Sequence, residues 1–178
     1  MNALIVDGYN VIHAWPELRV VLTKRGLADA RALLVAELGE YAAVRDAAVT
    51  VVFDSTRRGD HATPPEEIDR VTVVFSGRGG DSADHVIERL AFEMAARGGA
   101  SDVLVATDDR LQRSLVSAMG VRSIGVDSLR ALVAGVRAEI AERGRRGLDE
   151  LPRRPRVEDS LHRDVRGRLE RLRRGEEE

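Results

Sequence analysis

The sequence predicts an α/β protein with a mostly parallel β-sheet flanked by helices. Two observations lead to this prediction. Apolar, β-branched runs of four or five residues recur along the chain, and runs of this kind are typical of strands buried on both faces. Segments with helical spacing of apolar residues lie between these runs. Alternation of strand and helix is the pattern of a parallel sheet covered by helices.

The first half of the chain begins this alternation. Residues 3–6 give the first strand, and residues 8–26 are predicted to be a loop. Residues 49–53 give the second strand, and the polar, proline-containing residues 55–69 are predicted to be a mobile loop. Residues 27–45 are predicted to be a helix, because one stripe holds Leu27, Ala30, Leu34, Leu38 and Tyr41.

The second half continues it with strands at residues 71–75, 103–106 and 121–124. Residues 76–80 are glycine-rich and predicted to be a flexible turn. One helix is predicted to start near Ser82, a short one to follow residue 109, and a third to be capped by Asp127 or Ser128. The apolar positions expected on these three helices are Ile87, Leu90, Ala91 and Met94, then Leu111, Leu115 and Val116, then Leu132, Val136 and Ile140.

The predicted core domain covers residues 1–142, and residues 143–178 are predicted to be an appendage. Residues 144–155 are basic and contain glycine and two prolines, which is typical of a linker. Residues 157–174 show weak helical spacing. Such a C-terminal helical tail either packs on the domain or orders on a partner, and its apolar stripe favours packing.

The composition fits one domain with a core of aliphatic side chains. Of 178 residues 43% are hydrophobic and only 3% aromatic. The chain has no cysteine, which excludes disulfides, thiolate catalysis and Cys-ligated zinc, and which fits a reducing cytosol. We expect a cytoplasmic protein with no membrane partner, because no run reaches the roughly 18–20 apolar residues of a bilayer span and no basic leader precedes Asp7.

The charge argues against bulk electrostatic attraction to nucleic acid, because the formal net charge is −2. Positive charge is uneven, however, and the tail from Arg143 onward is dense in arginine. Lys24 is the only lysine. Arginine matches phosphate geometry better than lysine does, although a GC-rich genome explains the bias equally well.

Carboxylates lie where the predicted strands end, or just beyond. They are Asp7, Asp54, Asp81, Asp84 and Asp109. The carboxyl ends of parallel strands share one edge of the sheet, where ligands bind. Acids gathered there repel one another unless a cation joins them, and a hard divalent cation is the usual partner. The sequence therefore predicts a metal site.

Each of these acids also has a structural interpretation. Asp7 precedes Gly8 and is a possible turn former, Asn10 a possible turn cap, and Asp54 a possible helix cap or loop acid. Asp81 and Asp84 share a face if both lie in a helical first turn, but acids there also suit an ordinary helix start.

Two adjacent acids, Asp108 and Asp109, follow the fourth strand. One of them is expected to cap the next helix and the other to be free for the metal, and their spacing leaves open which is which.

Other catalytic patterns are absent from the sequence. The four histidines form no ligand-spaced cluster, so a zinc site is not expected. No Ser-His-Asp arrangement is recognisable, and residues 77–80 lack the Gly-Lys-Ser/Thr of a P-loop. Arg57, Arg58 and Arg78 are candidates to bracket the acidic edge and hold phosphates, with solvated surface arginines as the alternative.

Several segments together resemble one known family. They are Leu-Ile-Val-Asp-Gly-Tyr-Asn-Val-Ile at residues 4–12, Val-Val-Phe-Asp at 51–54, Ser-Ala-Asp-His-Val-Ile-Glu at 82–88 and Val-Ala-Thr-Asp-Asp at 105–109, with further matches at 14–18 and 169–175. The chain resembles the YacP-like bacterial branch of the NYN domain family over nearly its whole length. That branch is close to the ribosome-associated endoribonuclease that cleaves mRNA in the ribosomal A site.

The resemblance implies a PIN-like fold, a three-layer sandwich with a metal-dependent nuclease site at the carboxyl edge of its sheet. The family's acids map onto Asp7, Asp84 and Asp109, with Asn10 and Asp54 close by. Asp81 falls where relatives carry a different acid. Asp108 occupies a position that looks like serine in relatives, which favours Asp109 as the ligand.

The expected function is hydrolysis of RNA phosphodiester bonds with Mg²⁺ or Mn²⁺, on mRNA and in association with the ribosome. Asp7 is the expected central ligand, completed by Asp84 and Asp109, with Asn10 orienting a ligand or contacting a phosphate. A rival expectation is a non-catalytic RNA- or ribosome-binding module with the same fold. A phosphohydrolase acting on small nucleotides is a third, which the lack of a nucleotide fingerprint disfavours.

Overall fold

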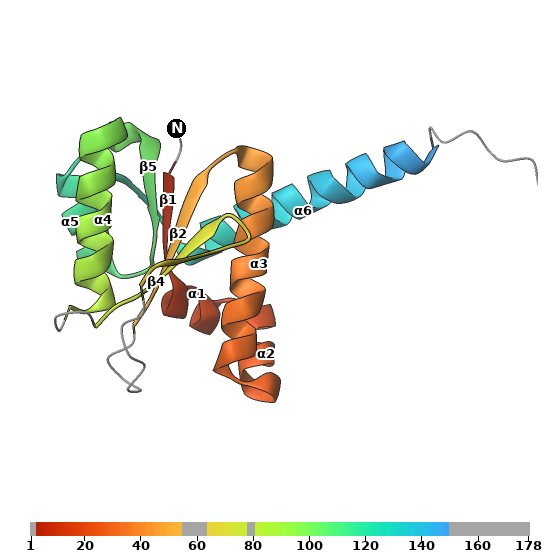
Figure 1. Ribbon diagram of the computed structural model, residues 1–178, viewed down its shortest axis with the longest axis horizontal. Helices are drawn as coiled ribbons and strands as arrows, with labels where there is room; N and C mark the ends of the chain where they lie inside the picture. The colour runs from red at the N-terminus through yellow and green to blue at the C-terminus, as the bar shows by residue number, and fades with distance from the viewer. Residues whose placement is uncertain (1–2, 55–63, 78–80, 150–178) are drawn as a thin grey trace, which may run out of the picture. The chain divides into compact units, whose positions relative to one another are not determined.

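A computed structural model describes residues 3–54, 64–77 and 81–149 (Figure 1). Its centre is a six-stranded sheet of order β3-β4-β2-β1-β5-β6, in which every neighbouring pair is parallel except β3–β4. The strands are β1 (Ala3–Asp7), β2 (Ala48–Phe53), β3 (Glu66–Ile68), β4 (Val71–Phe75), β5 (Val103–Ala106) and β6 (Arg122–Ile124). The mostly parallel α/β sheet is therefore confirmed.

Helices connect these strands. They are α1 (Gly8–Ala14), α2 (Pro16–Arg25), α3 (Leu27–Arg45), α4 (Ala83–Gly98), α5 (Arg110–Ala118) and α6 (Val126–Asp149), with a short 3-10 turn at Ala100–Asp102. None of the described helices is long and apolar enough to cross a membrane.

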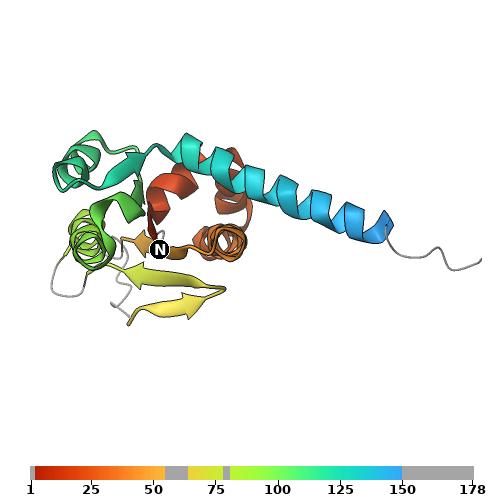
Figure 2. The same ribbon diagram turned by 90° about the horizontal axis from the view of Figure 1, so that it is seen from above.

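Two apolar clusters cover the two faces of the sheet. Along β1, Leu4 and Val6 pack with α1, α2, α3 and the first turns of α6, whereas Ile5 packs with α4 and α5. This division follows from the two-residue period of a strand. Figure 2 shows α3 and α4 on opposite sides of β1 and β2. Because both faces of the central strands are covered, β1, β2, β4 and β5 are almost continuously apolar.

The predicted loop at residues 8–26 is wrong, because this segment forms α1 and α2. Trp15 separates the two helices in an extended conformation, and Pro16 occupies the first turn of α2. Proline is favourable there, because a backbone N–H in the first turn has no partner within the helix. Each helix is short, and the apolar residues 20–22 of α2 are contiguous. The segment therefore carries no long periodic stripe that would predict a helix.

Strand β3 is a second correction. Residues 66–68 were expected in a loop, but they pair antiparallel with β4. Asp69 and Arg70 join the two strands with φ values of 49° and 67°. Two left-handed residues make a tight hairpin turn, yet Asp-Arg lacks the glycine that usually predicts one. The rest of the predicted loop, residues 55–63, lies outside the described residues.

Helix α3 has the predicted bounds, but α5 and α6 present different faces from those expected. In α5, Leu111 and Leu115 are 70% and 39% exposed, whereas Gln112 is buried beside Val116. In α6, Val136 is buried as expected, but Leu132 and Ile140 are exposed, and the core receives Val126, Leu129 and Val133 in their place. A stripe of leucines thus predicted the helices but not the side that packs.

Helix α6 also starts and ends differently from the prediction. Neither Asp127 nor Ser128 caps it, because the helix begins at Val126, whose backbone N–H donates to Asp108 Oδ1 (3.0 Å). It continues through residue 149, so the first part of the predicted linker is helical. The chain divides into two compact units at Ile140 and Ala141. The predicted tail helix at 157–174 lies outside the described residues.

Candidate functional site

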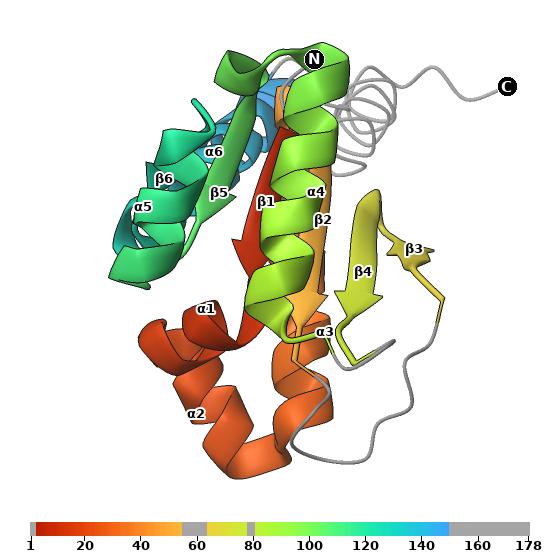
Figure 3. The same ribbon diagram turned by 90° about the vertical axis from the view of Figure 1, so that its left-hand side faces the viewer.

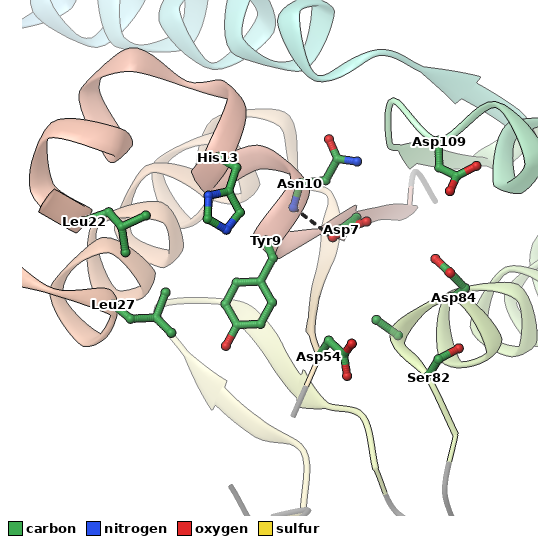
Figure 4. Close-up of a pocket in the computed structure, with 11 residues that line it drawn as sticks. Asp7, Tyr9, Asn10, His13, Leu22, Leu27, Asp54, Ser82, Asp84 and Asp109 are labelled. Carbon is green, nitrogen blue, oxygen red and sulfur yellow. Dashed lines mark hydrogen bonds between the residues drawn. The ribbon is translucent and has the colours of Figure 1, made fainter. Parts of the chain in front are cut away.

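A cavity of about 740 Å³ lies at the carboxyl edge of the sheet (Figure 4). Figure 3 shows the arrowheads of β1, β2 and β4 at this edge, next to α1 and the start of α4. Four of the predicted acids line the cavity: Asp7, Asp54, Asp84 and Asp109. The other described lining residues are Tyr9, Asn10, His13, Leu22, Leu27, Ser82 and Ala83.

Asp7 occupies the end of β1 and also the N-cap of α1. Its Oδ1 accepts the backbone N–H of Asn10 (3.1 Å). Gly8 is required next to it, because a Cβ there would lie 2.3 Å from Phe53 Cε1. Asp7 and Gly8 therefore form a strand-to-helix junction rather than an isolated turn.

The pKa of Asp7 is raised to about 6, chiefly because the carboxyl is buried. The hydrogen bond from the Asn10 N–H opposes this rise, and the charges of Asp84 and Asp109 add to it. The three acids thus repel one another electrostatically across the cavity. Negative charge at Asp7 is costly unless a cation compensates it.

Asp84 lies in the first turn of α4, and its Oδ1 accepts a hydrogen bond from Gln112 Nε2 (2.7 Å). Partial burial raises the pKa of Asp84, and the charges of Asp109 and Asp54 raise it further. Residues 82–84 start α4 as predicted, with Ser82 as the N-cap.

Asp109 and Asp108 both act as caps, so the predicted division between one cap and one free acid is too simple. Asp109 Oδ1 accepts the backbone N–H groups of Leu111 (2.7 Å) and Gln112 (3.2 Å) at the start of α5. Asp109 still lines the cavity, whereas Asp108 caps α6 and is not among the lining residues. This placement favours Asp109 over Asp108 as the functional acid.

Asp54 and Asp81 separate in the structure. Asp54 lines the cavity, and its Oδ1 accepts the hydroxyl of Ser76 (2.9 Å). Asp81 does not line it and instead pairs with Arg89 (2.7 Å). The predicted common face with Asp84 is wrong, because α4 begins only at Ala83 and Asp81 precedes the helix.

Asn10, which was predicted to bind substrate, lines the cavity. The other three candidates of this kind, Arg57, Arg58 and Arg78, lie outside the described residues.

Sequence reasoning missed Gln112. Its side chain is only 2% exposed and links two acids, because Nε2 donates to Asp84 while the backbone N–H donates to Asp109. Its Oε1 is buried and has no hydrogen-bond partner among the described residues. The Asp-x-x-Gln spacing from Asp109 is similar to that of a helix capping box, and this signal would have marked Gln112.

An aromatic cluster beside the cavity was also missed. The Arg31 guanidinium lies 5.2–5.4 Å from the ring centroids of Tyr9, Phe53 and Phe75, and it donates a hydrogen bond to the Tyr9 hydroxyl. The Tyr9 and Phe53 ring centroids are 5.3 Å apart. No local signal connects these residues, because they come from α1, α3, β2 and β4.

The donor chemistry fits a hard divalent cation, because carboxylate oxygens are the ligands that Mg²⁺ and Mn²⁺ prefer. The repulsion that raises the pKa of Asp7 points the same way. As the side chains are placed, however, no three or more His, Cys, Asp or Glu side chains among the described residues lie close enough to share one ion.

Comparison with known proteins identifies the family. Residues 4–174 match the model of the YacP-like NYN domain. YacP of Bacillus subtilis (strain 168) is 30% identical over 183 residues, which cover 99% of each protein. The crystal structure of Rae1 (YacP) from Bacillus subtilis matches 98% of this chain and 96% of its own at 29% identity, with a TM-score of 0.67. A single-substitution mutant of Rae1 matches 85% and 86% at 30% identity, with a TM-score of 0.68.

The fold is therefore that of a PIN-like α/β domain of nuclease type. The chain belongs to the YacP-like NYN domain family, as the sequence motifs indicated. Membership of this family supports a nuclease-type function in RNA metabolism.

Proposed function

We propose that this protein is a metal-dependent endoribonuclease that hydrolyses phosphodiester bonds of mRNA in association with the ribosome. One observation carries the proposal. Asp7, Asp84 and Asp109, which come from three separate parts of the chain, line one cavity at the carboxyl edge of the sheet. Membership of a nuclease-type family supports the choice of RNA as the substrate.

Bound Mg²⁺ or Mn²⁺ would supply an activated water and neutralise charge on the reacting phosphate. Asp7 is the proposed central ligand for two reasons. It lies at the end of the central strand β1, and the negative charges of Asp84 and Asp109 both raise its pKa, so a cation at Asp7 would relieve this repulsion. Asp84 is oriented by Gln112. Asp109 uses Oδ1 for its capping bonds, so Oδ2 is the oxygen proposed to face the cation.

The remaining roles concern the substrate. Asn10 is proposed to orient a ligand or to contact a phosphate, and Asp54 to contribute through a water molecule. Acids do not attract RNA, so Arg57, Arg58, Arg78 and the arginine-rich tail are proposed to hold the phosphates.

A non-catalytic RNA- or ribosome-binding module is the second candidate. It is favoured by the spacing of the described acids, no three of which close around one ion as placed. Such a module would bind RNA normally and would show no cleavage that depends on Mn²⁺.

The decisive experiment is cleavage of a translated mRNA by the purified protein and ribosomes, with wild type compared with Asp7→Asn. We expect Asp7→Asn to lose at least about 100-fold in rate, since charge stabilisation at the reacting phosphate depends on it. Asp81→Asn is the matched control, because Asp81 lies outside the cavity lining and pairs with Arg89. Equal cleavage by wild type and Asp7→Asn would contradict the catalytic proposal.

A further inference from the structure

We propose that Tyr9, His13, Leu22 and Leu27 form a nucleobase subsite that takes one unstacked base of single-stranded RNA. This inference rests on the proposed function, because it assigns a substrate group to the other end of the same cavity. The class of ligand follows from the two different ends of that cavity.

The cavity has an acidic end and an apolar end. In Figure 4, Asp84 and Asp109 lie on one side of Asp7, and His13, Leu22 and Leu27 lie on the other. At about 740 Å³ the cavity is larger than hydrated cations and carboxylates need and falls within the size range of ligand pockets. A nucleotide has the matching division, with an anionic phosphate at one end and a flat, largely apolar base at the other.

Tyr9 is the proposed stacking surface, and the protein fixes it in advance. The Arg31 guanidinium lies 5.2 Å from its ring centroid and donates a hydrogen bond to its hydroxyl, while Phe53 packs at a tilted angle of 52°. A ring that is already immobilised loses little conformational entropy when a base binds. The chain has only one Trp, two Tyr and three Phe, and three of these six rings, Tyr9, Phe53 and Phe75, gather here.

Helix geometry places the other walls. His13 lies four residues after Tyr9 in α1, so the two side chains share a face, and His13 is exposed with its ring nitrogens available to the edge of a base. Leu22 and Leu27 are half-buried against the core and line the cavity with their remaining surface.

The chain connectivity sets which base would bind. Tyr9 is two residues from Asp7, the proposed ligand at the reacting phosphate, so the base on Tyr9 belongs to a nucleotide next to the bond that is cut. Stacking is tolerant of sequence, because every base has a π-face. His13 is the one polar side chain proposed at the edge of the base. We therefore expect the subsite to bind any of the four bases with similar affinity.

A double-mutant cycle between protein and RNA tests this subsite. The probe is a fluorescein-labelled single-stranded RNA, intact or with one abasic ribose at each position in turn, bound in Ca²⁺ and followed by anisotropy. With wild type, we expect one abasic position to weaken binding on the order of tenfold. With Tyr9→Leu, the intact RNA should lose about the same factor, and the abasic RNA should lose nothing further.

Tyr41→Leu is the matched control, because Tyr41 is the other tyrosine of the chain and packs on the core without lining the cavity. It should preserve the penalty for the abasic position. Tyr9→Phe should also preserve it, because the aromatic face remains. If the abasic penalty is the same with Tyr9→Leu as with wild type, or if Tyr9→Phe behaves like Tyr9→Leu, the subsite is overturned.

Exposed His13 provides a variant that does not endanger folding if Tyr9→Leu does. His13→Ala should weaken binding of the intact RNA more than binding of the abasic RNA, and an equal loss for both would overturn the subsite.

The outcomes also distinguish the subsite from the proposed nuclease function. RNA binding with base coupling but no Mn²⁺-dependent cleavage would refute the nuclease and leave the subsite. Cleavage of translated mRNA without base coupling would overturn the subsite and leave the nuclease. No binding of the single-stranded RNA would overturn the subsite, and the ribosome-dependent cleavage experiment would still decide the nuclease.

Discussion

Gln112 connects two acids that are far apart in the sequence. Its side-chain amide donates to Asp84 and its backbone N–H donates to Asp109. A buried donor of this kind holds a carboxylate in one orientation and favours its charged form. We therefore expect Gln112 to position the acids rather than to bind substrate, because its side chain is buried.

Replacing Gln112 by methionine, which is similar in shape, removes this donor. We expect Gln112→Met to weaken Mn²⁺ binding on the order of tenfold, as for other residues that orient metal ligands. Stability should change little, because the unpaired Oε1 is removed together with the donor. Isothermal titration with Mn²⁺ and a urea melt measure the two effects. Unchanged Mn²⁺ affinity would mean that Gln112 does not position Asp84.

The sequence predicted the acids of the cavity better than the residues that form hydrogen bonds or ion pairs with them. Asp7, Asp84 and Asp109 follow from strand ends and from the family motifs, and all three line the cavity. Asp81 was grouped with them by spacing, and its ion pair with Arg89 separates it. A spacing argument holds only if both residues lie in the same helix, and the sequence does not fix the first helical residue.

Helices α3 and α6 are joined by an ion pair whose acid is buried and whose arginine is half exposed. Glu37 on α3 is only 3% exposed, and its Oε1 lies 2.9 Å from Arg137 Nη2 on α6. Burial raises the pKa of Glu37, and the charge of Arg137 opposes this rise. A second pair, Arg130 with Glu17 (2.9 Å), is exposed.

Arg137→Met should destabilise the protein by about 1–3 kcal/mol, because it leaves the carboxylate of Glu37 buried without its partner. Arg137 is half exposed, which keeps the loss below that of a fully buried pair. The loss should be full only above the raised pKa of Glu37 and should disappear as the pH falls towards 4, where Glu37 is neutral in both proteins. Urea unfolding at pH 7 and pH 4 measures it.

Arg130→Met is the matched control, because it removes an exposed ion pair and should cost much less than Arg137→Met. A similar loss for both variants, or a loss for Arg137→Met that does not depend on pH, would contradict this account of Glu37.

Among the elements, α3 was predicted to the residue, since nineteen residues carry a sustained stripe. The short elements α1, α2 and β3 were not predicted, whereas the short strands of the parallel sheet and α5 were. Helix α2 and strand β3 take their conformation from the neighbours on which they pack, and local pattern carries little information at such lengths.

The whole molecule brings together acids that repel one another. Folding places Asp7 near Asp84 and Asp109 and buries it, which raises its pKa to about 6. Because the native state then holds its proton more tightly than the unfolded chain, metal-free stability should fall as the pH rises from about 4 to about 6. Above that range the full penalty remains.

Asp7→Asn should therefore stabilise the metal-free protein at pH 7.5, on the order of 1–3 kcal/mol, and should give no gain near pH 3.5. Mn²⁺ should raise the urea midpoint of wild type by mass action but leave Asp7→Asn nearly unchanged. Urea melts in EDTA and in Mn²⁺ at both pH values measure these effects. A less stable Asp7→Asn protein at pH 7.5 would contradict this account, because it would mean that the Asp7 carboxylate stabilises the metal-free fold.

The sequence by itself determined the α/β class, the strands of the parallel sheet, the family and the principal acids. These follow from local apolar pattern, from strand ends that share an edge, and from motifs of adjacent residues. Only the tertiary structure decided which acid caps which helix and which faces of α5 and α6 pack. It also decided that Tyr9 lines the cavity and that Gln112 and Arg31 are hydrogen-bonded to residues of its lining. Those features depend on contacts between residues distant in sequence, for which local spacing carries no signal.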